Sequence, residues 1–179
     1  DVYKRQSMTA AGDRVAIGAH YNDGNGNGSG HVRVYAYSSG SWSQLGSDID
    51  GEVSNDRSGY SVSMNDAGDR VAIGAPYNDG TAYDAGHVRI YAYSSGSWTQ
   101  LGSDIDGESS SDYSGWSVSM NDAGDRVAIG AKYNDGTASD AGHVRIYAYS
   151  SGSWSQLGRC LFGASPSPPE ASGGSMTAA

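Results

Sequence analysis

A repeat of 56 residues constrains this chain more than any other feature. The string AGDRVAIGA begins at Ala11, Ala67 and Ala123, which are 56 residues apart. Segments 63–102 and 119–158 differ at only three of forty positions. These positions are Pro76/Lys132, Tyr83/Ser139 and Thr99/Ser155. Self-similarity at a fixed period of this length is typical of propellers and solenoids, in which each repeat is one structural unit.

Each unit contains four strand-like runs, which in the second unit are 59–64, 70–75, 87–93 and 98–105. Alternation in the second run places Val71, Ile73 and Ala75 on one face, and Gly68 in the preceding turn can take a positive φ. Four short antiparallel strands in a unit of roughly 40–50 residues indicate a propeller blade. The sequence therefore predicts an all-β fold, a fragment of a β-propeller with four-stranded antiparallel blades. A β-solenoid is the alternative, although its coils are shorter.

The segment 58–79 (SGYSVSMNDAGDRVAIGAPYND) resembles an FG-GAP repeat of the integrin-α-like propellers. Gly59-Tyr60 stands where that family opens its inner strand, and Gly74-Ala75-Pro76 matches its Gly-Ala-Pro element. The resemblance implies a propeller of about seven blades, of which this chain holds part. It also implies that the long loops gather on one rim, where larger members of the family bind partner proteins.

The repeat predicts the boundaries of the units along the chain. Residues 1–6 (DVYKRQ) match nothing in the repeats and resemble a translated sequencing adapter. Three blades are expected at 7–50, 58–106 and 114–158, the first with its inner strand mostly missing. A divergent linker (159–174) and the start of a further blade (175–179) follow.

The charge balance excludes some classes of partner. The chain has 11 basic and 20 acidic residues and a formal net charge of −9. Nucleic acids and anionic membranes need clustered Lys and Arg, so neither is an expected partner. No apolar run approaches the roughly 18 residues that span a bilayer, so no membrane insertion is expected. Cys160 is the single cysteine, which leaves no intrachain disulfide.

Acidic residues recur at fixed spacing in the loops between units. Alternating carboxylates around a glycine could wrap one Ca²⁺, so calcium is the possible cofactor. The alternative is a solvated acidic linker whose aspartates accept hydrogen bonds from backbone amides. The residues of this candidate calcium set are Asp48, Asp50, Glu52, Asp56, Asp104, Asp106, Glu108 and Asp112.

The long loop after the second strand carries the motif YNDG. Tyrosine beside Asn and Asp at a rim can stack on and hydrogen-bond a sugar or a peptide. Turn formation is the alternative explanation of the motif. The candidate ligand-binding residues are Tyr77, Asn78, Asp79 and Asp84, with their copies Tyr133, Asn134, Asp135 and Asp140. The repeated histidines His31, His87 and His143 are expected to be structural.

These features favour a non-catalytic binding or adhesion module of a larger secreted or cell-surface protein, with a protein or glycan as its ligand. An enzyme is not expected, because a catalytic centre needs different residues from different blades and these repeats are nearly identical. The alternatives are a propeller hydrolase or lyase whose active site lies on other blades, and a structural spacer.

Overall fold

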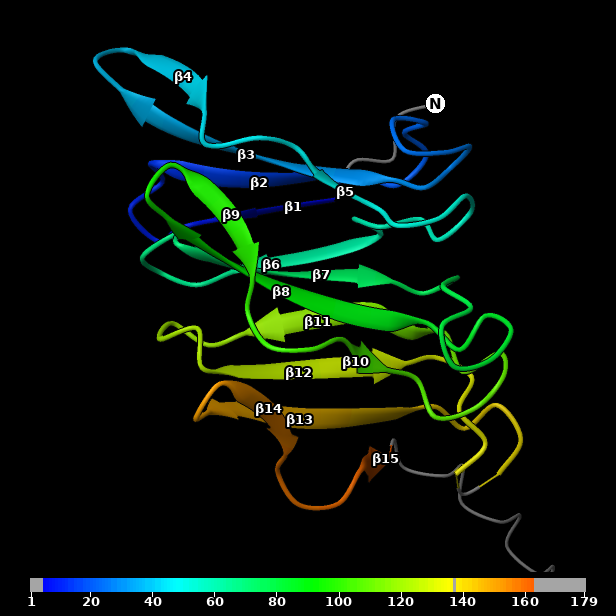
Figure 1. Ribbon diagram of the computed structural model, residues 1–179. Coiled ribbons are helices and arrows are strands. Elements are labelled where there is room, and N and C mark those ends of the chain that lie inside the picture. The colour runs from blue at the N-terminus through cyan, green and yellow to red at the C-terminus, as the bar shows by residue number, and fades with distance from the viewer. Residues whose placement is uncertain (1–4, 137, 163–179) are drawn as a thin grey trace, which may run out of the picture.

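The computed structural model describes residues 5–136 and 138–162 of the 179-residue chain. These residues form strands and turns, with no helix among them. Three antiparallel sheets stack face to face, and Figure 1 shows them in chain order from top to bottom. The predicted all-β architecture of successive blades is confirmed. Within the part of the chain that the structure describes, nothing forms a helix that could cross a membrane.

The strands follow the same order in every blade. The first blade contains β1 (Arg5–Met8), β2 (Arg14–Ala19), β3 (His31–Ser38), β4 (Ser41–Gln44) and β5 (Ile49–Asp50). The second contains β6 (Ser61–Met64), β7 (Arg70–Ala75), β8 (His87–Ser94), β9 (Ser97–Gln100) and β10 (Ile105–Asp106). The third contains β11 (Ser114–Met120), β12 (Arg126–Ala131), β13 (His143–Ser150), β14 (Ser153–Gln156) and β15 (Leu161–Phe162). In each blade the first three strands pair in sequence, and the last two both pair with the third.

The fourth run of each unit differs from the expected continuous strand. In the second blade it divides into β9 and β10, which pair with opposite ends of β8. Gly102 interrupts it with a φ of 79°, a conformation that only glycine adopts without strain. The interruption places Asp104 next to His87, at 3.5 Å between Oδ2 and Nδ1. The break therefore creates a polar pair at the edge of the blade.

Hydrophobic residues cover both faces of each blade, as the sequence predicts. Val71 and Ile73 of β7 pack into a core shared with the first blade. Ala72 of the same strand, with Val88 and Ile90 of β8, packs into a core shared with the third blade. Each of the larger side chains contributes about 1.5–3 kcal/mol through burial. Blade-to-blade stacking is thus the main source of stability.

Hydrogen bonds between equivalent positions join successive blades. The indole Nε1 of Trp98 donates to the carbonyl oxygen of Leu45 at 2.7 Å. Trp154 repeats this bond with Leu101, also at 2.7 Å. At the other end of the blade, Arg70 Nη1 donates to the carbonyl oxygen of Gly124 at 3.0 Å. Because these residues recur in every unit, the repeat itself specifies the stacking.

The structure adds detail at both ends of the repeat array. Strand β1 begins at Arg5, which pairs with Gly18, so it includes two residues of the segment 1–6. Strand β15 takes the place of β10, with Leu161 paired to Val144. Residues 163–179 lie outside the described residues, with the rest of the predicted linker and the start of a further blade.

Candidate functional site

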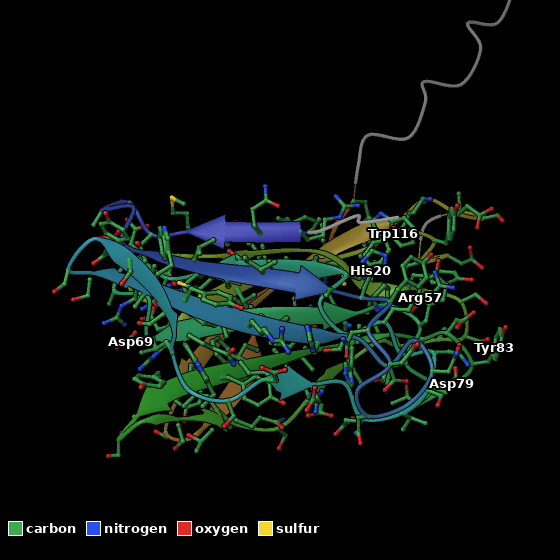
Figure 2. All side chains as sticks on the ribbon, turned by 90° about the horizontal axis from the view of Figure 1, so that it is seen from above. His20, Arg57, Asp69, Asp79, Tyr83 and Trp116 are labelled. Carbon is green, nitrogen blue, oxygen red and sulfur yellow. The ribbon has the colours of Figure 1, made fainter. Side chains whose placement is uncertain are left out.

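The long loops of all three blades lie at one end of the structure. Figure 2 shows His20, Arg57, Trp116, Asp79 and Tyr83 at this end, whereas Asp69 lies at the opposite end. The loops connect the second strand to the third and each blade to the next. We call this end the loop rim, and the predicted YNDG residues lie on it.

Most polar residues of the YNDG motif shape their own loop. Asn78 Oδ1 accepts a hydrogen bond from the Gly80 amide at 2.8 Å. Asp79 Oδ1 accepts one from the Asp84 amide at 2.7 Å, and Asp84 has a φ of 49°. The same bonds recur for Asn134 and for Asp135 with Asp140. These side chains have the contacts of turn formers.

The tyrosines of the motif pack against other aromatic rings rather than shaping their own loop. Tyr77 lies 5.2 Å from Tyr113 and 6.3 Å from Tyr60, measured between ring centres. Tyr60 in turn lies 4.7 Å from Trp116. The rings join blade to blade in a continuous aromatic network with cations on its faces. We call it the mouth cluster, and it comprises His20, Tyr21, Arg57, Tyr60, Tyr77, Tyr113, Trp116, Lys132 and Tyr133.

Two cations of the mouth cluster stack on aromatic rings. The Arg57 guanidinium carbon lies 4.4 Å from the Tyr77 ring centre and 4.8 Å from that of Tyr21. Lys132 Nζ lies 4.3 Å from the Trp116 ring centre and 4.4 Å from that of Tyr133. Stacking occupies the faces of a guanidinium and leaves its N–H edges for hydrogen bonds.

Among the described residues, neither cation pairs with a carboxylate. The arginine–carboxylate pairs within residues 5–136 and 138–162 involve Arg33, Arg89 and Arg145. Arg57 donates instead to the hydroxyl of Tyr21, at 2.9 Å. In a chain with a net charge of −9, the stacked side chains of Arg57 and Lys132 place positive charge on the loop rim.

His20 is the titratable base of the mouth cluster. Its side chain is buried, and its Nδ1 atom has no hydrogen-bond partner among the described residues. Its ring centre lies 5.2 Å from that of Tyr60. Burial lowers the pKa of His20, and the positive charge of Arg57 lowers it further. The imidazole is therefore neutral near pH 7 and able to accept a proton.

The mouth cluster collects positions at which the repeats differ. His20, Pro76 and Lys132 are equivalent residues of the three units. Arg57 is equivalent to Tyr113, and Tyr60 to Trp116. All of these except Pro76 belong to the mouth cluster. Different residues from different blades meet here, although the repeats are otherwise nearly identical.

A hollow of about 370 Å³ adjoins the mouth cluster between the inner strands of the three blades. Its lining includes Arg5 of β1, Ser61 of β6, Ser117 of β11, and the rings of Tyr60 and Trp116. A ligand in this hollow would contact residues from every blade.

The candidate calcium residues do not meet at one point. Some accept hydrogen bonds from asparagine side chains, some pair with arginines, and the others face histidines or line a cavity. Asp56 and Asp112 accept hydrogen bonds from the Asn78 and Asn134 side chains of the following unit, at 3.2 and 3.0 Å. Glu52 pairs with Arg89 of the next blade, with Nη1 and Oε1 3.1 Å apart.

The remaining acidic residues face the histidines or line a cavity. Asp48 accepts two hydrogen bonds from Arg33, at 2.9 and 2.7 Å, which lower its pKa to about 2. Asp50 Oδ1 lies 3.9 Å from the imidazole of His31. Asp106 lines a cavity of about 450 Å³ with Asp104. Burial raises the pKa of Asp106, and the neighbouring charge of Asp104 raises it further.

The histidines bring carboxylates of neighbouring blades together. Glu52 of one blade, with His87 and Asp104 of the next, forms a group whose ligand atoms lie within 4.8 Å of one another. Burial lowers the pKa of His87 to about 4, so its imidazole is neutral. Glu108, His143 and Cys160 form the equivalent group one blade later.

Comparisons with known proteins identify the scaffold. No family model and no curated protein matches the chain, so the FG-GAP resemblance stays a prediction. Among solved structures, it is similar to a candidate 6-phosphogluconolactonase from Bacteroides uniformis, with a TM-score of 0.58 and 10% identity. The match covers 90% of this chain and 41% of that protein, so the chain spans less than half of its length. At this identity the likeness shows the fold.

Two further solved structures match with TM-scores below 0.5, which is too low to support a conclusion about the fold or the function. A periplasmic gluconolactonase from Pseudomonas aeruginosa matches at 0.41 and 10% identity, over 92% of this chain and 58% of that protein. An acylaminoacyl peptidase from Pyrococcus horikoshii matches at 0.45 and 13% identity, over 86% of this chain and 24% of that protein.

These comparisons correct two expectations, that the chain is a non-catalytic adhesion module and that it is not an enzyme. A solved structure that shares its fold is named for lactone hydrolysis, not for adhesion. The physical argument against an enzyme also fails, because the few divergent positions of the repeats gather in the mouth cluster.

Sequence reasoning missed most of the mouth cluster. It selected Tyr77 and Tyr133 but not His20, Arg57 or Trp116. The signal that could have found them was the list of differences between repeats, which includes Lys132. The sequence alone does not show that these differing residues come together, because they meet only when the blades stack.

Proposed function

We propose that this chain is part of a propeller hydrolase that opens ring esters, with the mouth cluster as its active site. The observation that carries the proposal is the buried, neutral imidazole of His20 near Arg57, a cation without an acidic partner among the described residues. A general base with a pKa below its ordinary value and nearby positive charge are what water addition to an ester carbonyl requires. This proposal places the active site on the blades of this chain.

The chemistry assigns separate roles to the base and the cation. The His20 imidazole accepts a proton as a water oxygen forms a bond to the lactone carbonyl carbon. Arg57, whose charge already acts on His20, stabilises the negative charge that develops on the carbonyl oxygen. The ring C–O bond then breaks, and the imidazolium returns its proton to the departing ring oxygen. The product is a hydroxy acid, which ionises and releases one proton.

The aromatic rings suggest the class of substrate. Tyr60 and Trp116 line the hollow, and the ring centre of Tyr60 lies 5.2 Å from that of His20. Aromatic side chains of this kind supply rigid surfaces with polar edges, which suit a sugar-derived ring. A sugar lactone also agrees with the lactonase name of the similar structure. The predicted glycan ligand is thereby retained as a sugar-derived substrate.

The test is the ring opening of glucono-δ-lactone, followed by proton release in weak buffer. We expect a rate above the spontaneous one, with a profile that is flat near pH 7. The rate should fall only as the pH drops below about 6.5, because the pKa of His20 is lowered from its ordinary value. An acid limb centred above pH 7, or no rate above the spontaneous one, would refute the proposal.

Two finer predictions from the sequence are kept as proposals beside the hydrolase. One is an extracellular or cell-surface location. The other is bound Ca²⁺, for which the described structure supplies groups of carboxylates and histidines without identifying an ion.

A further inference from the structure

We propose that the interfaces between blades bind a divalent transition-metal ion through a carboxylate of one blade and a histidine of the next. Among the described residues, two groups of candidate ligands join one blade to the next, Glu52–His87–Asp104 and Glu108–His143–Cys160. A third group, His31–Asp48–Asp50, lies within the first blade, where Arg33 already holds Asp48. This proposal does not depend on ring-ester hydrolysis, because neither site includes a residue of the mouth cluster.

The spacing of the first site suits a small ion. His87 Nδ1 and Asp104 Oδ2 are 3.5 Å apart. Ligand atoms of a tetrahedral zinc site with bonds of about 2.0–2.1 Å lie about 3.4 Å apart. Arg89 holds Oε1 of Glu52 at 3.1 Å, and the second carboxylate oxygen is available to complete the set. An imidazole with carboxylates favours a transition metal over Ca²⁺, which prefers oxygen ligands alone.

The buried histidines lack any other polar partner. The side chains of His87 and His143 are 2% and 1% exposed, and neither makes a hydrogen bond within the described part of the chain. At His143 it is Nδ1 that faces the carboxylate of Glu108, at 3.9 Å. Buried polar groups are almost always paired, so the His87 imidazole, whose Nδ1 faces Asp104 at 3.5 Å, calls for a ligand. A metal–nitrogen bond supplies one.

An arginine orients the bridging carboxylate at each site. Arg145 Nη1 lies 3.5 Å from one Glu108 oxygen, and the other oxygen faces His143 Nδ1 at 3.9 Å. Arg145 Nη2 also donates to the Asp106 carbonyl oxygen at 2.7 Å, which fixes its position. Each arginine therefore holds one carboxylate oxygen and leaves the second available, as outer partners of metal ligands do.

The cavity at the first site is strongly acidic. Its volume is about 450 Å³, and its lining includes Glu52, Asp56, Asp79, Asp104 and Asp106 around His87. Burial raises the pKa of Asp56, and the negative charge of Asp79 raises it as well. A divalent cation would relieve this repulsion between carboxylates.

The second site differs in one ligand, which provides a spectroscopic test. Cys160 occupies the position that Asp104 holds in the preceding unit. A thiolate is a strong ligand for Zn²⁺ and Co²⁺. Bound Co²⁺ should therefore show a thiolate charge-transfer absorption, which Cys160→Ser removes.

The main experiment titrates Zn²⁺ into the protein by calorimetry, with Ca²⁺ in parallel. We expect two Zn²⁺ per chain, one after His87→Gln and none after the additional change His143→Gln. Glu52→Gln, at an exposed position, should weaken the first site by about 100-fold or more without affecting folding. The matched control is Asp122→Asn, because Asp122 is exposed in the turn between β11 and β12 and belongs to no group of candidate ligands among the described residues.

Three results would overturn the proposal. They are no Zn²⁺ binding by the wild-type protein, unchanged stoichiometry in both His87→Gln and Glu52→Gln, and Ca²⁺ binding tighter than Zn²⁺ at the same sites. Circular dichroism of each variant separates loss of a ligand from loss of the fold.

Discussion

Replacing His20 with Gln is expected to lower kcat for the ring opening of a sugar lactone by about 10²–10⁴-fold. Glutamine has a similar size and can fill the buried space, but it cannot accept a proton from water. The KM should change little, because the rings of Tyr60 and Trp116 and the cations Arg57 and Lys132 stay in place. Steady-state rates at pH 6.5, corrected for spontaneous hydrolysis, measure both constants.

The repeats supply controls that the fold already tolerates. His20→Pro introduces the residue of the second unit, Pro76, and should lose activity while the blade stays folded. Tyr83→Ser introduces the residue of the third unit at a position that is 68% exposed and outside the mouth cluster, so it should leave kcat unchanged. Full activity in both His20 variants would show that the base lies elsewhere.

Gly74→Ala is expected to destabilise the protein by about 3 kcal/mol or more, as overpacking of a tight contact does. Gly74 lies in β7, where a Cβ atom would overlap the carbonyl oxygen of Gly115 on the adjacent blade. Backbone atoms of two stacked blades cannot separate without disturbing the shared core. Urea unfolding, monitored by tryptophan fluorescence, measures the change in free energy.

The equivalent residue of the third blade provides the control. A Cβ atom on Gly130 would overlap only the hydroxyl of Ser117, a side chain that can rotate away. Gly130→Ala should therefore cost less than about 1 kcal/mol. Equal costs at Gly74 and Gly130 would mean that the second and third blades do not approach each other as described.

The sequence predicts the blades well because their determinants are local and repeated. The run 70–75 has the alternation of a strand, and Gly68 takes the predicted positive φ of 65°. The split of the fourth run was missed, since the hydrophobic pattern of 98–105 does not show that Gly102 adopts a left-handed conformation. Turn geometry of this kind depends on pairing with β8.

The site was harder to predict because it depends on contacts over long sequence separations. The spacing within one loop was compatible with a single ion bound by Asp48, Asp50, Glu52 and Asp56. The pairing of blades instead sends Glu52 toward Arg89 and turns Asp56 toward Asn78. A carboxylate in a repeat protein has neighbours on the next unit, which spacing within one loop does not reveal.

The most direct test of the account measures whether residues from three different repeats meet at the mouth cluster. Nuclear Overhauser effects between ring protons report such contacts in the 18.5 kDa chain. We predict cross-peaks between His20 and Tyr60 and between Tyr60 and Trp116, whose ring centres are 5.2 and 4.7 Å apart. Spectra in which these rings show contacts only within their own repeat would contradict it.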